Sequence, residues 1–133
     1  MKRQIVLSLA ACGLALGGVS FGLTAWANVD NVLGRYPGSV RLQSTGIDLH
    51  SVAQGAISRQ AVYETADEQS SVKRWFAARL EISPASELYT DSTCAWLAQS
   101  KPAVWLRREV SVLLCAEPHG TRVVVNESVY LWP

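Results

Sequence analysis

A chain of 133 residues has room for one domain, and its 12 Lys/Arg against 11 Asp/Glu leave a formal net charge of +1. Residues 28–133 keep ten of those cations and all eleven carboxylates, so no basic surface for nucleic acid is expected. Hydrophobic residues make up 49% of the chain, a value that the first segment inflates, but Val, Leu, Ile, Trp and Tyr recur to its end, which disfavours intrinsic disorder.

The first 27 residues read as one apolar segment behind two cations. Lys2 and Arg3 precede a run over residues 5–27 whose polar members are only serine and threonine. A helix of that length, at ~1.5 Å per residue, is long enough to cross a hydrocarbon core of ~30 Å. Because the cations stay in the cytoplasm, residues 28–133 are expected to form an extracytoplasmic domain, either anchored in the cytoplasmic membrane or secreted, for example into the periplasm.

Three fates of this segment are open. Residues 25–27, Ala-Trp-Ala, have the small-x-small form that signal peptidase cuts, which would free the chain at Asn28. The apolar run is longer than that of a typical signal peptide, which favours an uncleaved transmembrane anchor contacting the membrane. Residues 9–12, Leu-Ala-Ala-Cys, resemble a lipobox with an acylated cysteine, although the chain stays apolar well beyond Cys12.

The next part of the chain predicts two strands followed by a helix. Residues 36–39, Tyr-Pro-Gly-Ser, are typical of a turn. Residues 40–44 and 57–65 alternate apolar and polar side chains, as half-buried strands do. A helix should follow, since four apolar residues fall on one helical stripe: Val72, Trp75, Phe76 and Leu80.

The ends of this helix also have signals in the sequence. Asp67 is one candidate N-cap, and Thr65 with Glu68 is an alternative capping box. Pro84 prevents the helix from continuing. A loop is expected over residues 82–92.

The last third of the chain predicts three more strands. Residues 93–98 suggest a short strand that Ser-Lys-Pro at 100–102 interrupts. Residues 103–116 alternate again except at Arg108, which predicts a bend at Arg107-Arg108. After a turn at 117–120, residues 121–131 form the last strand. The fold class is therefore α+β, an antiparallel sheet in the order β-β-α-β-β-β with one helix packed on one face.

Four short motifs resemble one group of proteins. They are Tyr-Pro-Gly-Ser at 36–39, Tyr-x-Thr-x-Asp at 63–67, Val-x-x-Trp-Phe at 72–76 and Gly-Thr-x-Val at 120–123. This layout is similar to that of small exported bacterial domains without an assigned activity. The resemblance implies the same fold and compartment, and it implies no catalytic or binding residue.

Cys94 and Cys115 are the cysteines outside the apolar segment, and a disulfide is the natural interpretation in an oxidising compartment. Geometry raises an objection. If residues 100–102 were a tight hairpin turn, Cys94 would lie opposite Arg107, far from Cys115 along the strand. The bridge then requires Cys94 to lie in a loop or the chain to fold back near Arg107. Two separate buried thiols are the alternative.

Few residues suggest catalysis or metal binding. His50 and His119 both fall in expected loops. Cys115, Glu117 and His119 stand at alternate positions near a turn, where side chains two apart share a face. They are the one combination that suggests an enzyme site, and no cofactor is indicated.

Aromatic residues give the leading candidate site. Strand alternation places several of them on the face opposite the helix, where Trp, Tyr and Arg often dominate binding energy. The candidate protein-binding residues are Trp96, Trp105, Arg107, Tyr130 and Trp132. The favoured hypothesis is a non-catalytic, membrane-tethered or secreted accessory subunit that binds a protein partner. A small extracytoplasmic hydrolase or metal-dependent enzyme is one alternative, and a carrier of a small apolar ligand between helix and sheet is another.

Overall fold

The computed structural model describes residues 17–18, 33–45, 52, 54–82, 89–90, 93–102 and 104–131. The predicted signal or anchor segment lies outside these residues, apart from Gly17 and Gly18, as do His50 and Trp132. Within the described part of the chain, no helix is long and apolar enough to cross a membrane.

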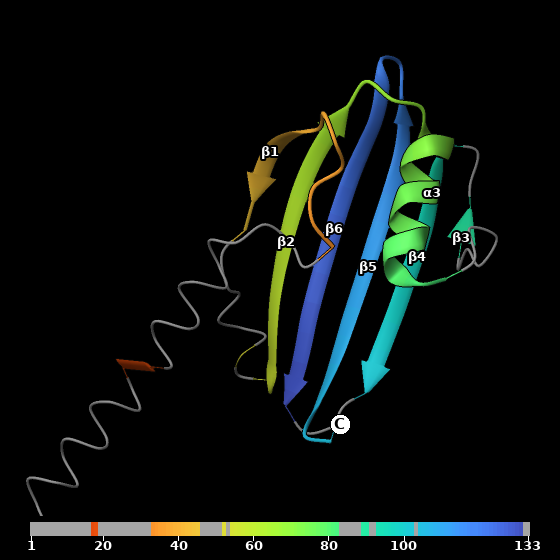
Figure 1. The fold of residues 1–133 in the computed structure, drawn as a ribbon. Coiled ribbons are helices and arrows are strands. Elements are labelled where there is room, and N and C mark those ends of the chain that lie inside the picture. The colour runs from red at the N-terminus through yellow and green to blue at the C-terminus, as the bar shows by residue number, and fades with distance from the viewer. Residues whose placement is uncertain are drawn as a thin grey trace, which may run out of the picture.

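Among the described residues, one six-stranded antiparallel sheet carries the helix α3 on one face (Figure 1). The sheet order is β1-β2-β6-β5-β4-β3. In chain order the elements are β1 (Val40–Ser44), β2 (Ala56–Thr65), α3 (Gln69–Leu80), β3 (Tyr89–Thr90), β4 (Cys94–Pro102), β5 (Leu106–Glu117) and β6 (Gly120–Leu131). The expected α+β fold and its strand–helix order are therefore confirmed, with the two-residue β3 added between the helix and β4.

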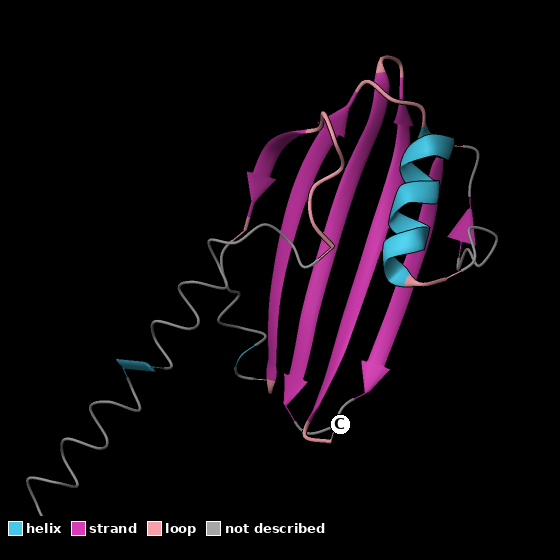
Figure 2. Cartoon of the chain, viewed as in Figure 1, coloured by secondary structure: helices cyan, strands magenta, loops and turns pink. Residues whose placement is uncertain are grey.

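The helix and the segment 33–39 lie on the same face of the sheet, which we call the inner face (Figures 1 and 2). Its core is formed by Phe76 and Leu80 of the helix against Tyr63, Val112 and Val123 of the sheet, all nearly or fully inaccessible to solvent. The predicted stripe is confirmed at Val72, Phe76 and Leu80, and Trp75 packs at the edge of this core. The opposite side of the sheet is called the outer face.

The helix starts differently from either prediction. Its N-cap is Glu68, with no side-chain capping hydrogen bond. Asp67 does not cap the helix because its carboxylate instead accepts a hydrogen bond of 2.6 Å from the hydroxyl of Tyr36. The helix ends before Pro84, as expected, where Glu81 adopts a left-handed conformation with φ 57°.

The predicted bend at Arg107-Arg108 is wrong. β5 runs without interruption from Leu106 to Glu117, and β4 extends beyond the predicted strand to Pro102. Arg108 departs from the apolar pattern because it faces the inner side of the sheet and pairs there with the carboxylate of Glu127, 3.1 Å away. The charged residue among the inward-facing apolar positions of β5 is therefore explained by its ion pair, not by a bend in the strand.

The disulfide between Cys94 and Cys115 is present, with an S–S distance of 2.08 Å. The geometric objection assumed a turn at residues 100–102, whereas β4 and β5 are joined through residues 103–105. This shift of the turn pairs Cys94 directly with Cys115 across the two strands. The bridge therefore requires neither a loop at Cys94 nor a fold in β5.

Removing the bridge should lower stability by about 3 kcal/mol, the chain-entropy value for a loop of this size. The double variant Cys94→Ser, Cys115→Ser is expected to unfold at a lower urea concentration than the oxidised wild type. A reductant should move the wild-type midpoint to that of the variant and leave the variant unchanged. If the urea midpoint of the wild type is the same with and without the reductant, this account is contradicted.

Candidate binding surface on the outer face of the sheet

The register of four strands places their outward side chains in rows across the outer face. Leu113 of β5 lies between Trp96 of β4 and Val124 of β6, which makes an apolar row. Farther along β5, Arg107 lies between Pro102 and Tyr130. These two rows are six residues apart along β5, or about 20 Å at the usual rise of a strand.

Between those rows the outer face is hollowed. The hollow measures about 380 Å³. Small side chains account for it, since Ala98, Ser100, Ser111 and Ser128 occupy positions where the neighbouring rows carry large ones. Its lining residues are Trp96, Ala98, Gln99, Ser100, Glu109, Val110, Ser111, Asn126 and Ser128.

The two ends of the hollow differ in chemistry. Trp96 stands at one end and is 41% exposed, which is high for a large apolar side chain. Beyond the other end, which Glu109 lines, the guanidinium of Arg107 lies 4.7 Å from the centre of the Tyr130 ring. Arg107 Nε is also 3.1 Å from Glu109 Oε1. The outer face therefore offers an indole at one end of the hollow and, just beyond the other end, a cation held over an aromatic ring.

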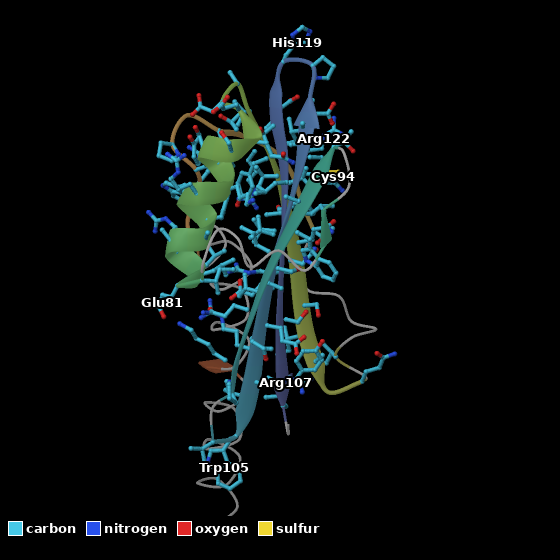
Figure 3. The ribbon with its side chains drawn as sticks, turned by 90° about the vertical axis from the view of Figure 1, so that its right-hand side faces the viewer. Glu81, Cys94, Trp105, Arg107, His119 and Arg122 are labelled. Atoms are coloured by element: carbon cyan, nitrogen blue, oxygen red, sulfur yellow. A yellow bond between two sulfur atoms is a disulfide. The ribbon has the colours of Figure 1, made fainter. Side chains whose placement is uncertain are left out.

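Three of the five predicted binding residues share this face, namely Trp96, Arg107 and Tyr130. Trp105 lies outside the strands, in the β4–β5 turn, where it is 72% exposed. Figure 3 places Trp105 and His119 at opposite ends of the long strands. Trp132 is outside the described residues. The binding role of all five stays a prediction.

The polar floor of the hollow was not anticipated. The hydroxyls of Ser58 and Ser128 lie 2.9 Å apart, and the Gln60 amide donates to Asn126 Oδ1 at 2.7 Å. In the sequence these residues look like ordinary solvated positions of two strands. The only available signal is that small or polar side chains recur at the outward positions of neighbouring strands, and this becomes meaningful once the register is known.

The residues suggested for an enzyme site are occupied by other interactions. Cys115 is in the disulfide, and Glu117 lies 3.4 Å from Arg122 Nη1. His119 is exposed in the β5–β6 turn. Within the described residues no three His, Cys, Asp or Glu side chains form a group suited to a metal ion.

The sequence also suggested a carrier that holds a small apolar ligand between helix and sheet. The space between helix and sheet is filled by side chains such as Phe76 and Tyr63.

A buried ionic cluster on the inner face was also missed. The Glu127 side chain is only 3% exposed and accepts from Arg59 Nε at 2.8 Å, with Arg59 Nη2 at 2.7 Å. Its second oxygen is 3.1 Å from Arg108 Nη2. The cluster joins β2, β6 and β5 on the inner face, beyond the end of the helix. Glu127 interrupts an otherwise apolar row of β6, which is the signal that the sequence offered.

Replacing Glu127 by Gln should destabilise the protein by about 3 kcal/mol or more, because it leaves two arginines without the carboxylate that compensates them in a mostly buried place. Glu117→Gln is the matched control. That change removes a partly exposed ion pair with Arg122 and should cost less than about 1 kcal/mol. Urea unfolding of the two variants measures the difference, and similar losses would show that burial of the cluster is unimportant.

The motifs that carry the resemblance meet where β2 leads into the helix. The ring of Tyr36 packs edge-on against Trp75, with centroids 5.5 Å apart, while its hydroxyl donates to Asp67. This hydrogen bond, burial and the negative charge of Asp67 raise the pKa of Tyr36. Thr121 is fully buried and donates to the backbone carbonyl of Asp67 at 2.8 Å. The motif residues thus have a structural role, and the relationship to the exported group stays a prediction.

Gly120 completes this junction, because a Cβ there would lie 1.9 Å from the carbonyl oxygen of Thr65. Gly120→Ala should therefore cost more than about 2 kcal/mol through overpacking and backbone strain at φ +147°. Gly38→Ala is the control, since its φ of +74° is also unfavourable but a Cβ there has no neighbour within 4 Å. In thermal unfolding, the melting temperature of Gly120→Ala should be well below that of Gly38→Ala. Equal melting temperatures would refute the close contact.

In comparisons with known proteins, no family model, no curated protein and no solved structure matches this chain.

Proposed function

We propose that this chain is a non-catalytic extracytoplasmic domain that binds a protein partner on the outer face of its sheet, as an accessory subunit of a membrane-associated assembly. One observation carries the proposal. A hollow of about 380 Å³ lies on the outer face beside Trp96, whose indole is 41% exposed. Exposed aromatic side chains beside a concave surface are the usual anchors of protein interfaces.

The dimensions of the surface suit an extended segment of a partner. Trp96 and Arg107 mark two rows about 20 Å apart along the strands, a distance that about six residues of extended chain cover. Between them, the hydroxyls of Ser100, Ser111 and Ser128 offer both donors and acceptors. A partner's backbone groups can be paired there, which avoids the cost of burying them unpaired.

Two independent features support an extracytoplasmic compartment. The disulfide between Cys94 and Cys115 forms and persists in oxidising environments, which supports a location outside the cytoplasm. The apolar run over residues 5–27 behind Lys2 and Arg3 supports export with the domain on the outer side. Retention of that run would keep the domain at the membrane beside its partner.

The experiment is co-purification of the full chain from detergent-solubilised membranes, followed by titration of the recovered protein against variants. Trp96→Ala should weaken that binding about 30-fold, the effect of losing an interface anchor worth ~2 kcal/mol. Val40→Ser is the control, since Val40 is exposed on β1 at the far edge of the sheet. Circular dichroism should show that both variants are folded.

Two results would overturn the proposal. One is a partner that binds wild type and Trp96→Ala with equal affinity. The other is a loss of binding on substituting the exposed helix residue Arg74, with none on substituting Trp96.

A further inference from the structure

A second hollow lies on the inner face, near the end of the helix and away from the outer surface described above. It measures about 140 Å³. It is lined by Leu33, Arg79, Gln99, Lys101, Arg108 and Val110. Half of these residues are cations, and none of the described lining residues is acidic. Three separate elements, α3, β4 and β5, supply the positive charges.

Each of the three cations keeps hydrogen-bonding capacity for a ligand. Lys101 Nζ is 3.0 Å from one oxygen of Glu81, in an ion pair whose side chains are 57% and 73% exposed, so the attraction is weak. Arg79 places its guanidinium 4.0 Å from the centre of the Trp75 ring, which uses the face of the group and not its N–H bonds.

Arg108 gives the most direct indication. One of its terminal nitrogens binds Glu127. Its Nε is buried and, within the described residues, donates to no acceptor. A buried donor without an acceptor is costly. That nitrogen is closed to solvent, so a ligand in the hollow would instead meet the rest of the Arg108 side chain, which is 35% exposed.

The end of a helix normally opposes an anion, since its free carbonyl groups carry partial negative charge. Here three of the last four carbonyls of the helix are already paired. Ile82 N–H donates to Ala77 O at 3.1 Å, and Glu81 N–H donates to Ala78 O at 3.2 Å. The Gln99 amide donates to Leu80 O from within the lining of the hollow. The partial charge is thereby reduced, and the side-chain cations dominate.

We propose that this hollow binds a phosphate group through Arg79, Lys101 and Arg108. A phosphate presents several acceptor oxygens to cations arriving from different directions, and Arg and Lys are its common protein ligands. The group can belong to a free phosphate or to a lipid headgroup. Leu33 lines the hollow and follows the predicted membrane segment by six residues, so at most ~20 Å of chain separates them.

The first test is titration of the full chain in neutral detergent with inorganic phosphate, followed by ³¹P NMR or calorimetry. The double variant Arg79→Gln, Lys101→Gln should bind at least tenfold more weakly than wild type. Arg74→Gln is the matched control, because Arg74 lies on the same helix, is exposed and does not line the hollow. Neither substitution removes a core side chain, so both proteins should fold.

A second arm identifies the source of the phosphate. The full chain is placed in nanodiscs of phosphatidylcholine with or without phosphatidylglycerol, and lipid binding is compared for the same variants. Binding of inorganic phosphate that the double variant loses supports the proposal with a soluble ligand. Selective binding of phosphatidylglycerol that the double variant loses supports it with a lipid ligand. Binding in neither arm, or equal weakening by Arg74→Gln, overturns it.

Discussion

The antiparallel register of β2, β6, β5 and β4 decides which side chains meet on each face of this protein. Successive residues of a strand point to opposite faces, so a slip of one residue would move every core residue to the other side. Gly120 helps to fix the register, since its backbone lies against the Thr65 carbonyl with no room for a side chain. Between β4 and β5, the disulfide fixes Cys94 opposite Cys115.

This register gives the two faces different physical roles. The inner face combines an apolar core under the helix with the ionic cluster around Glu127, which lies beyond the end of the helix. Burial of that carboxylate is tolerated because two arginines on neighbouring strands compensate it. The outer face has a row of large apolar side chains, then small polar ones. This is the surface on which we propose that a protein partner binds.

Local patterns were sufficient to predict most of the fold. The stripe through Val72, Phe76 and Leu80 identified the helix, and period-two alternation identified the long strands. The errors share a cause. Arg108 looked like a break because its partner Glu127 lies on another strand, and Asp67 looked like a cap because its partner Tyr36 lies far back in the chain. A local pattern can show that a charged residue departs from the alternation, but it does not show which distant residue is its partner.

The candidate surface was predictable only in part. Alternation placed Arg107 and Tyr130 on the face opposite the helix, because each lies within a regular strand, and the register places Trp96 on the same face. It failed for Trp105, because the turn between β4 and β5 includes that residue. The hollow itself could not be predicted from the sequence, because it is formed by small side chains on several strands that become neighbours only when the sheet forms.

One edge of the sheet bears on how copies of this protein behave together. On its edge away from β5, β4 pairs with β3 at Ala95 and Trp96, and no other described strand lies along the rest of that edge up to Pro102. Free backbone groups along an edge attract strands from other chains and favour aggregation. Proline has no N–H to offer, and the charge of Lys101 disfavours stacking of a second copy. Both residues make pairing of this edge with a strand of a second copy less favourable.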